Sequence, residues 1–85
     1  MNERGTVAAG IDTHKDTHAL CVIDLVGRVV ATGAYAADGE GYDRIAAAIG
    51  DPRDCVVVGV EGTGSYGAGI SRRLAELGYD VVEVV

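Results

Sequence analysis

Two apolar segments of this chain each end in an acidic residue, and this pairing strongly limits the folds open to it. Asp12 follows the run VAAGI, and Glu61 follows the run CVVVGV. Short apolar runs rich in valine and isoleucine are typical of buried strands. If these strands are parallel neighbours, both carboxylates lie at the carboxyl edge of one sheet. Open α/β folds place their binding sites at that edge.

The remaining pattern predicts five strands with two helices between them. The strands are expected over residues 7–12, 18–24, 29–35, 55–60 and 81–85. A polar stretch and a Gly27-containing turn connect the first three, so these three are predicted to form an antiparallel meander. The fourth carries apolar side chains on both faces, as a buried central strand does.

Two segments show apolar residues at helical spacing, and each stripe ends at a glycine. The first stripe precedes Gly50 and Pro52 and consists of Tyr42, Ile45, Ala46 and Ile49. The second precedes Gly78 and consists of Ile70, Leu74 and Leu77, with Arg72, Arg73 and Glu76 expected to face outward.

The resulting β-β-β-α-β-α-β order is that of a ribonuclease H-like fold with a five-stranded mixed sheet. A strand–helix–strand crossover makes its strands parallel. In this arrangement the first and fourth strands are adjacent, which would bring Asp12 and Glu61 together. Both helices are expected to cover one sheet face. Because the other face lacks cover and the chain ends in an apolar strand, we expect a domain truncated before its C-terminal helices.

Composition narrows the functional classes. A chain of 85 residues holds one small domain, and its 13 acidic against 7 basic residues give a net charge of -6. This balance argues against a stand-alone nucleic-acid binder, whose surface is normally basic. No signal peptide or membrane-length apolar run is present, so a cytoplasmic protein without membrane partners is expected. Cys21 and Cys55 lie in apolar runs and are expected to be reduced.

Asp12 and Glu61 are the first candidate site. Two carboxylates on adjacent strands can hold Mg²⁺ or Mn²⁺ for phosphoryl transfer. Asp12 and Glu61 would then be both the metal ligands and the catalytic residues. The simpler interpretation is that acidic residues end strands because strand ends meet solvent.

The polar stretch 13–18 offers a second candidate. His14, Asp16 and His18 could bind a transition metal, but an ordinary solvated hairpin loop is the favoured interpretation. Lys15 could instead contact a phosphate near Asp12.

The glycine-rich stretch 62–67 precedes the second helix. Thr63 or Ser65 could cap that helix, where free N–H groups favour anions. The stretch matches neither a Walker A motif nor a Rossmann fingerprint. An equally good interpretation is structural: the glycines could simply allow another part of the backbone to pass close beside Glu61.

Two blocks resemble a known family. AGIDTHKDTHALCVIDLVGRVV (9–30) and VVGVEGTGSYG (57–67) look like the insertion-sequence transposases with a RuvC-like DEDD domain, a family that includes pilin-gene DNA invertases. The resemblance implies that Asp12 and Glu61 are the first two of four acidic Mg²⁺ ligands. It also implies DNA strand cleavage and transfer guided by a non-coding bridge RNA.

The same resemblance implies what these 85 residues lack. The family's other two acidic ligands and its separate C-terminal domain with a nucleophilic serine are not among them, and Ser65 does not correspond to that serine. Residues 1–85 are therefore expected to be a partial catalytic domain, inactive alone. Its apolar last strand and uncovered sheet face are expected to make it a homo-oligomer. In the full-length protein, DNA and a non-coding guide RNA are the expected partners, with nucleic-acid contacts from Lys15, Thr63 and Ser65.

Two other functions stay open. One is a nucleotide-binding module of the actin and sugar-kinase superfamily, although the turn after Asp12 lacks the glycine usual there. The other is an acidic interaction domain without chemistry.

Overall fold

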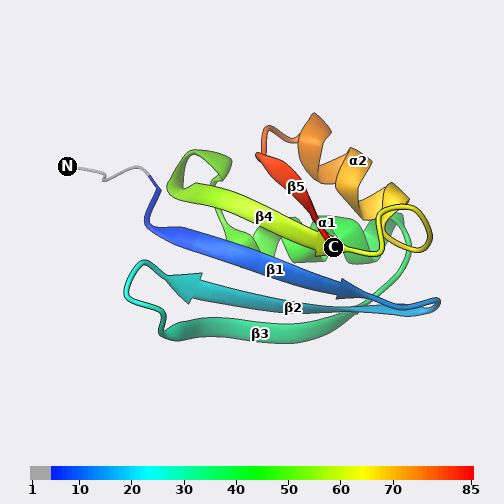
Figure 1. Cartoon of the computed structure of the whole chain (residues 1–85), viewed down its shortest axis with the longest axis horizontal. Helices are drawn as coiled ribbons and strands as arrows, with labels where there is room; N and C mark the ends of the chain where they lie inside the picture. The colour runs from blue at the N-terminus through cyan, green and yellow to red at the C-terminus, as the bar shows by residue number, and fades with distance from the viewer. Residues whose placement is uncertain (1–4) are drawn as a thin grey trace.

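A computed structural model of the chain describes residues 5–85 and shows one mixed five-stranded sheet (Figure 1). Its strands run in the order β3-β2-β1-β4-β5 across the sheet. Their bounds are Val7–Thr13 (β1), Thr17–Asp24 (β2), Val29–Ala36 (β3), Cys55–Glu61 (β4) and Val81–Val84 (β5).

The register of the strands confirms the predicted topology. β1, β2 and β3 are antiparallel neighbours, whereas β4 runs parallel to both β1 and β5. Gly10 pairs with Gly59 and Ile11 with Val60 across β1 and β4. The first and fourth strands are therefore adjacent and parallel, and the chain has the ribonuclease H-like α/β fold.

Helix α1 (Gly39–Ile49) begins and ends at residues suited to these positions. The side chain of Asp38 accepts a hydrogen bond of 2.8 Å from the backbone N–H of Gly41, which caps the first turn. Gly50 ends the helix with a φ of 96°, a value that side chains disfavour. A short 3-10 turn η1 (Pro52–Asp54) then leads into β4.

Helix α2 (Ala68–Glu76) corrects one prediction, because neither Thr63 nor Ser65 caps it. Gly67 occupies the cap position and supplies no side-chain bond. The preceding loop folds back on itself instead, with the N–H groups of Ser65 and Gly67 both donating to the carbonyl of Gly62. This turn keeps both hydroxyl-bearing residues away from the start of the helix.

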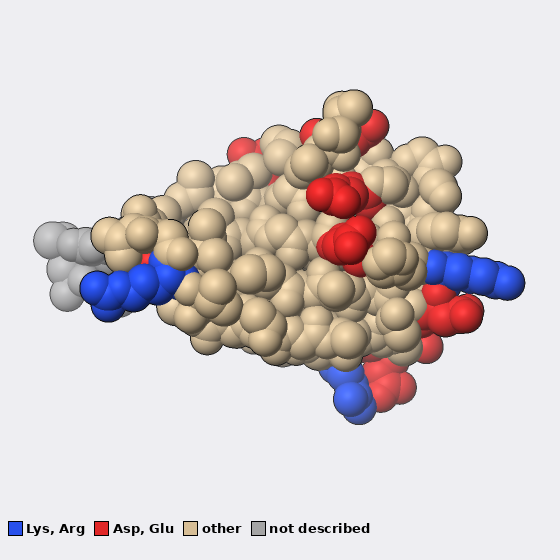
Figure 2. All heavy atoms as spheres, turned by 60° about the horizontal axis from the view of Figure 1, so that its bottom comes forward, with Lys and Arg blue, Asp and Glu red and all other residues tan. Residues whose placement is uncertain are grey.

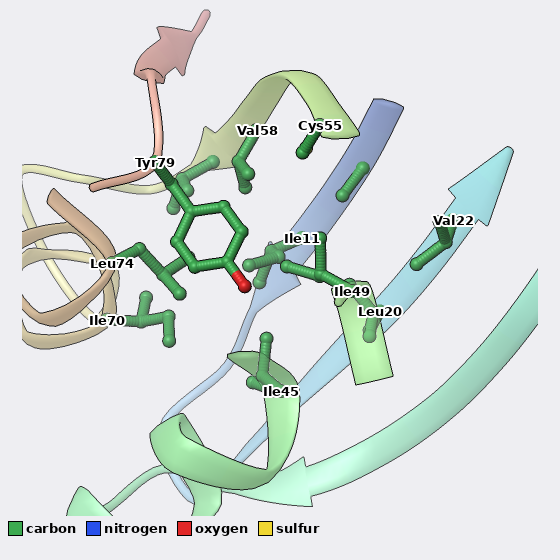
Figure 3. Packing of buried hydrophobic residues seen from close by; sticks show 12 residues of the cluster. Ile11, Leu20, Val22, Ile45, Ile49, Cys55, Val58, Ile70, Leu74 and Tyr79 are labelled. Atoms are coloured by element: carbon green, nitrogen blue, oxygen red, sulfur yellow. The ribbon is translucent and has the colours of Figure 1, made fainter. Parts of the chain in front are cut away.

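The core lies between the helices and one face of the sheet (Figure 3). Ile45 of α1 and Ile70 and Leu74 of α2 are fully buried there. Tyr79, which follows α2, points into the same cluster and its hydroxyl donates to the carbonyl of Ala46 at 3.0 Å. The core also contains Ala9, Ile11, Leu20, Val22, Ile49, Cys55, Val58 and Val60.

The end of α2 differs from the sequence pattern. Leu77 was expected on the buried stripe, but the helix ends at Glu76 and Leu77 is 37% exposed. Since Leu77 no longer follows the helical spacing, Tyr79 fills the core at this end. Arg73 lies across from α1 and its Nε donates to Asp43 at 2.9 Å, which ties the two helices together.

The sheet face opposite the helices, hereafter the outer face, is uncovered in the part of the chain that the structure describes. Val82 and Val84 of β5 remain 43% and 41% exposed. On β4, Val57 and Gly59 are only partly buried on this face, so the prediction that β4 is buried on both faces is wrong. Val56 is 48% exposed, but it lies where the register between β1 and β4 shifts. Strand composition alone could not separate these cases, because the β-branched valine favours a strand whether its face is covered or open.

Cys21 and Cys55 are both free thiols. Neither helix among residues 5–85 has the length and apolar character needed to cross a membrane.

Candidate functional site

Asp12 and Glu61 follow immediately on the paired residues Ile11 and Val60. Since β1 and β4 are parallel, the two carboxylates emerge side by side at the carboxyl edge of the sheet. Both residues are exposed, and both line one trough on the outer face with a volume of about 540 Å³. Figure 2 shows acidic groups lying close together within a broad uncharged surface.

The rest of the trough is apolar, and the small residues on its floor leave the hollow above the sheet. Gly10 and Gly59 are paired across β1 and β4 at its centre, and Ala19 of β2 lies opposite Asp12. Val82 and Val84 border it on β5. The two carboxylates are the acidic groups among the residues lining this trough.

A side-chain hydrogen bond that the sequence analysis missed joins the two strand ends. The hydroxyl of Thr13 donates to the backbone carbonyl of Glu61 at 2.6 Å. Gly62, with a φ of 75°, lies against it, and a Cβ at Gly62 would come 2.6 Å from Thr13 Oγ1. In the sequence, Thr13 directly follows Asp12 and Gly62 directly follows Glu61. Only the tertiary structure shows that these two residues lie against each other.

His14 and His18 lie in different environments. His14 is exposed, and its Nε2 lies 3.2 Å from Asp12 Oδ2. His18 is completely buried on the core side and stacks on Tyr42 of α1, with ring centroids 5.8 Å apart. Burial lowers the pKa of His18 below its ordinary value.

The suggested transition-metal site in the 13–18 stretch is therefore wrong. Within residues 5–85, no three or more His, Cys, Asp or Glu side chains gather in a group that could hold a metal ion. The exposed turn formed by His14, Lys15 and Asp16 agrees with the predicted solvated hairpin loop. His18, in contrast, belongs to the core.

The residues expected to contact nucleic acid lie in the two segments that directly follow β1 and β4. Lys15 is exposed in the turn after β1. Ser65 is exposed and Thr63 half-buried in the loop between β4 and α2. Both segments begin at the edge of the sheet that carries the carboxylates.

The chemistry of this edge suits a hard divalent cation better than a soft one. Asp12 and Glu61 provide exposed carboxylate oxygens, which Mg²⁺ and Mn²⁺ prefer. Mg²⁺ also keeps several of its waters, for which an open site leaves room. The donor set therefore fits such an ion, with two protein ligands from this chain.

Residues 9–85 match the family model DEDD_Tnp_IS110, which is described as a transposase. The chain belongs to this transposase family. The match covers nearly the whole chain and confirms the resemblance carried by its two sequence blocks. No individual curated protein matches the chain. Membership in this family favours a transposase domain over a nucleotide-binding module of the sugar-kinase type. The turn after Asp12 agrees with this, because it lacks the glycine that is usual in the sugar-kinase superfamily.

Proposed function

We propose that this transposase-family chain forms part of a catalytic domain that cleaves and transfers DNA strands with the help of a divalent cation. The supporting observation is the position of Asp12 and Glu61, side by side at the carboxyl ends of adjacent parallel strands. A strand end is rigid, yet it leaves the carboxylates open to a substrate. Both requirements hold for a phosphoryl-transfer site.

In this proposal Asp12 and Glu61 are catalytic residues that hold Mg²⁺ or Mn²⁺. The bound cation would activate the attacking oxygen and stabilise the leaving oxygen. Thr13 keeps the two strand ends in register through its bond to Glu61. Two protein ligands hold Mg²⁺ only weakly, so these 85 residues alone are expected to bind it poorly and to leave DNA uncut.

The proposed partners are DNA and a non-coding guide RNA, contacted in part by Lys15, Thr63 and Ser65. A cation at the carboxylates would lower the repulsion between phosphates and a chain of net charge -6. The proposed location of this activity is the cytoplasm. The two further acidic ligands, the serine nucleophile and a homo-oligomeric state belong to the same proposal.

Metal titration tests the site directly. Mn²⁺ binding to the wild-type chain, followed by calorimetry and by the electron paramagnetic resonance signal of free Mn²⁺, is compared with Asp12→Asn and Glu61→Gln. Both variants should lose most of the binding, since each removes a charged ligand. Glu83→Gln, an exposed carboxylate on β5, is the matched control and should bind as the wild type does. Equal binding by Asp12→Asn and wild type would move the site elsewhere.

Nucleic-acid binding is measured separately, with short DNA and RNA duplexes and fluorescence anisotropy in Ca²⁺. Lys15→Ala should weaken binding about equally for all sequences and reduce the slope of affinity against salt by about 1, as expected for one lost phosphate contact. Arg28→Ala, in the exposed turn at the other end of β2, is its control. Saturable ATP binding without DNA binding would favour the nucleotide-binding alternative.

A further inference from the structure

His14 makes the one side-chain hydrogen bond that the structure gives to the Asp12 carboxylate among residues 5–85. Its Nε2 lies 3.2 Å from Asp12 Oδ2, and the side chains are 64% and 58% exposed. A pair this exposed adds little to the stability of a fold. Fold stability therefore does not account for the position of His14 beside Asp12, a candidate metal ligand.

The backbone holds His14 in place. Its N–H donates to the carbonyl of Thr17 at 3.0 Å and closes the turn between β1 and β2. The preceding residue, Thr13, is tied to Glu61 by its hydroxyl at 2.6 Å. A second bond, from the N–H of Ala37 to the carbonyl of Asp16, fastens the same turn to the end of β3. The imidazole is thus presented from a braced turn, which lowers the entropy cost of holding it on Asp12.

We propose that His14 is a positioning residue that fixes the orientation of the Asp12 carboxylate for a divalent cation. This inference rests on the proposed function. An imidazole that donates from Nε2 to Oδ2 restrains rotation of the carboxylate and leaves Oδ1 to serve as the ligand. Hydrogen-bond partners of metal ligands commonly act this way, and their loss costs about tenfold to a hundredfold in metal affinity.

Glutamine and asparagine substituted for His14 distinguish a bond made specifically from Nε2 from the effect of any polar side chain at this position. The amide nitrogen of glutamine reaches about as far as Nε2 of histidine, whereas that of asparagine reaches only as far as Nδ1. His14→Gln should therefore keep most of the Mn²⁺ affinity, and His14→Asn and His14→Ala should lose about tenfold or more. Thr17→Ala, at an exposed position where β2 begins, is the matched control and should leave the affinity unchanged.

A readout without metal supplements the titration. In the metal-free chain, the ¹⁵N spectrum of the neutral His14 ring should show the proton on Nε2. Asp12→Asn should shift this signal, while Thr17→Ala should not. A predominant Nδ1–H form, or a His14 signal indifferent to Asp12→Asn, would overturn the inference.

The metal results also separate this inference from the proposed function. If Asp12→Asn loses Mn²⁺ but His14→Ala binds as the wild type does, the site stands and the role of His14 falls. Tighter binding by His14→Ala would show that His14 competes with the cation, which also contradicts the inference. If Asp12→Asn binds normally, the metal site itself is misplaced, and both ideas fall together.

Discussion

The hydroxyl of Thr13 and the carbonyl of Glu61 lie 2.6 Å apart and join the ends of two strands that are 48 residues apart in the chain. This bond spans the parallel pair β1 and β4 at the edge where Asp12 and Glu61 emerge. It keeps the two candidate ligands at a constant relative position, although it involves no carboxylate oxygen.

Removing the Thr13 hydroxyl should loosen this edge. Thr13→Val keeps the β-branched shape, and loss of one hydrogen bond should lower the free energy of unfolding by about 1 kcal/mol. Mn²⁺ affinity should fall as well. Urea unfolding and metal titration measure the two effects. Thr32→Val, an exposed threonine on β3, is the control, and an equal change there would assign the effect to β propensity.

Gly62 should tolerate no side chain. Gly62→Ala places a Cβ 2.6 Å from Thr13 Oγ1 at a φ of 75°, so strain and loss of the Thr13 bond should combine. We expect a loss of about 2 kcal/mol or more in the free energy of unfolding. Gly64→Ala in the same loop meets nothing within 4 Å and should change the stability by less than about 0.5 kcal/mol. Similar losses in both variants would contradict this account.

The buried His18 should make the fold sensitive to acid. Its pKa is lowered by burial, so the unfolded chain binds a proton more readily than the folded one. Stability from neutral His18 is therefore present above the ordinary pKa of about 6.5 and is lost as the pH falls through the lower pKa of the folded state. Tyr42 stacks on the ring and Tyr35 lies opposite it on β3, while His14 adds a small repulsion.

Urea midpoints measured across this pH range test the role of His18. His18→Phe keeps an aromatic ring against Tyr42 but cannot take up a proton, so its midpoint should depend less on pH than that of the wild type. His18→Gln should be destabilised at every pH and also show the weaker dependence. A wild-type acid slope that persists in both variants would assign it to other groups.

The outer face should promote self-association. Exposed valines on β5 continue the apolar trough to the edge of the sheet, and such surfaces favour pairing with another chain. We expect dimers in light scattering at physiological salt, where the net charge of -6 is largely screened. Val82→Lys should shift the chain to monomers, whereas Val26→Lys, at a 76% exposed turn position, should not. A wild-type chain that stays monomeric at high concentration would refute this.

The strands, both helices and the ribonuclease H-like order followed from the sequence, because hydrophobic periodicity and glycine stops are local signals. The convergence of Asp12 and Glu61 followed as well. The antiparallel meander makes β3 parallel to β1, and the crossover helix α1 makes β4 parallel to β3, so the two acidic residues stand at the same edge. Local pattern could not say which face of a strand is covered. Nor could it reveal the register shift between β1 and β4, where Val56 is 48% exposed instead of buried.

Contacts between distant segments were decided by the tertiary structure. His14 and His18 stand four residues apart in one polar stretch, yet one contacts Asp12 in solvent and the other lies in the core against Tyr42. His18 pairs with Thr13 in the ladder between β1 and β2, whereas His14 lies beyond that ladder in the turn. The Thr13–Glu61 bond and the burial of Tyr79 likewise depend on packing between distant elements. The chain's own pattern thus determined the elements and the acidic residues at their ends, whereas strand register and helix packing determined which side chains surround them.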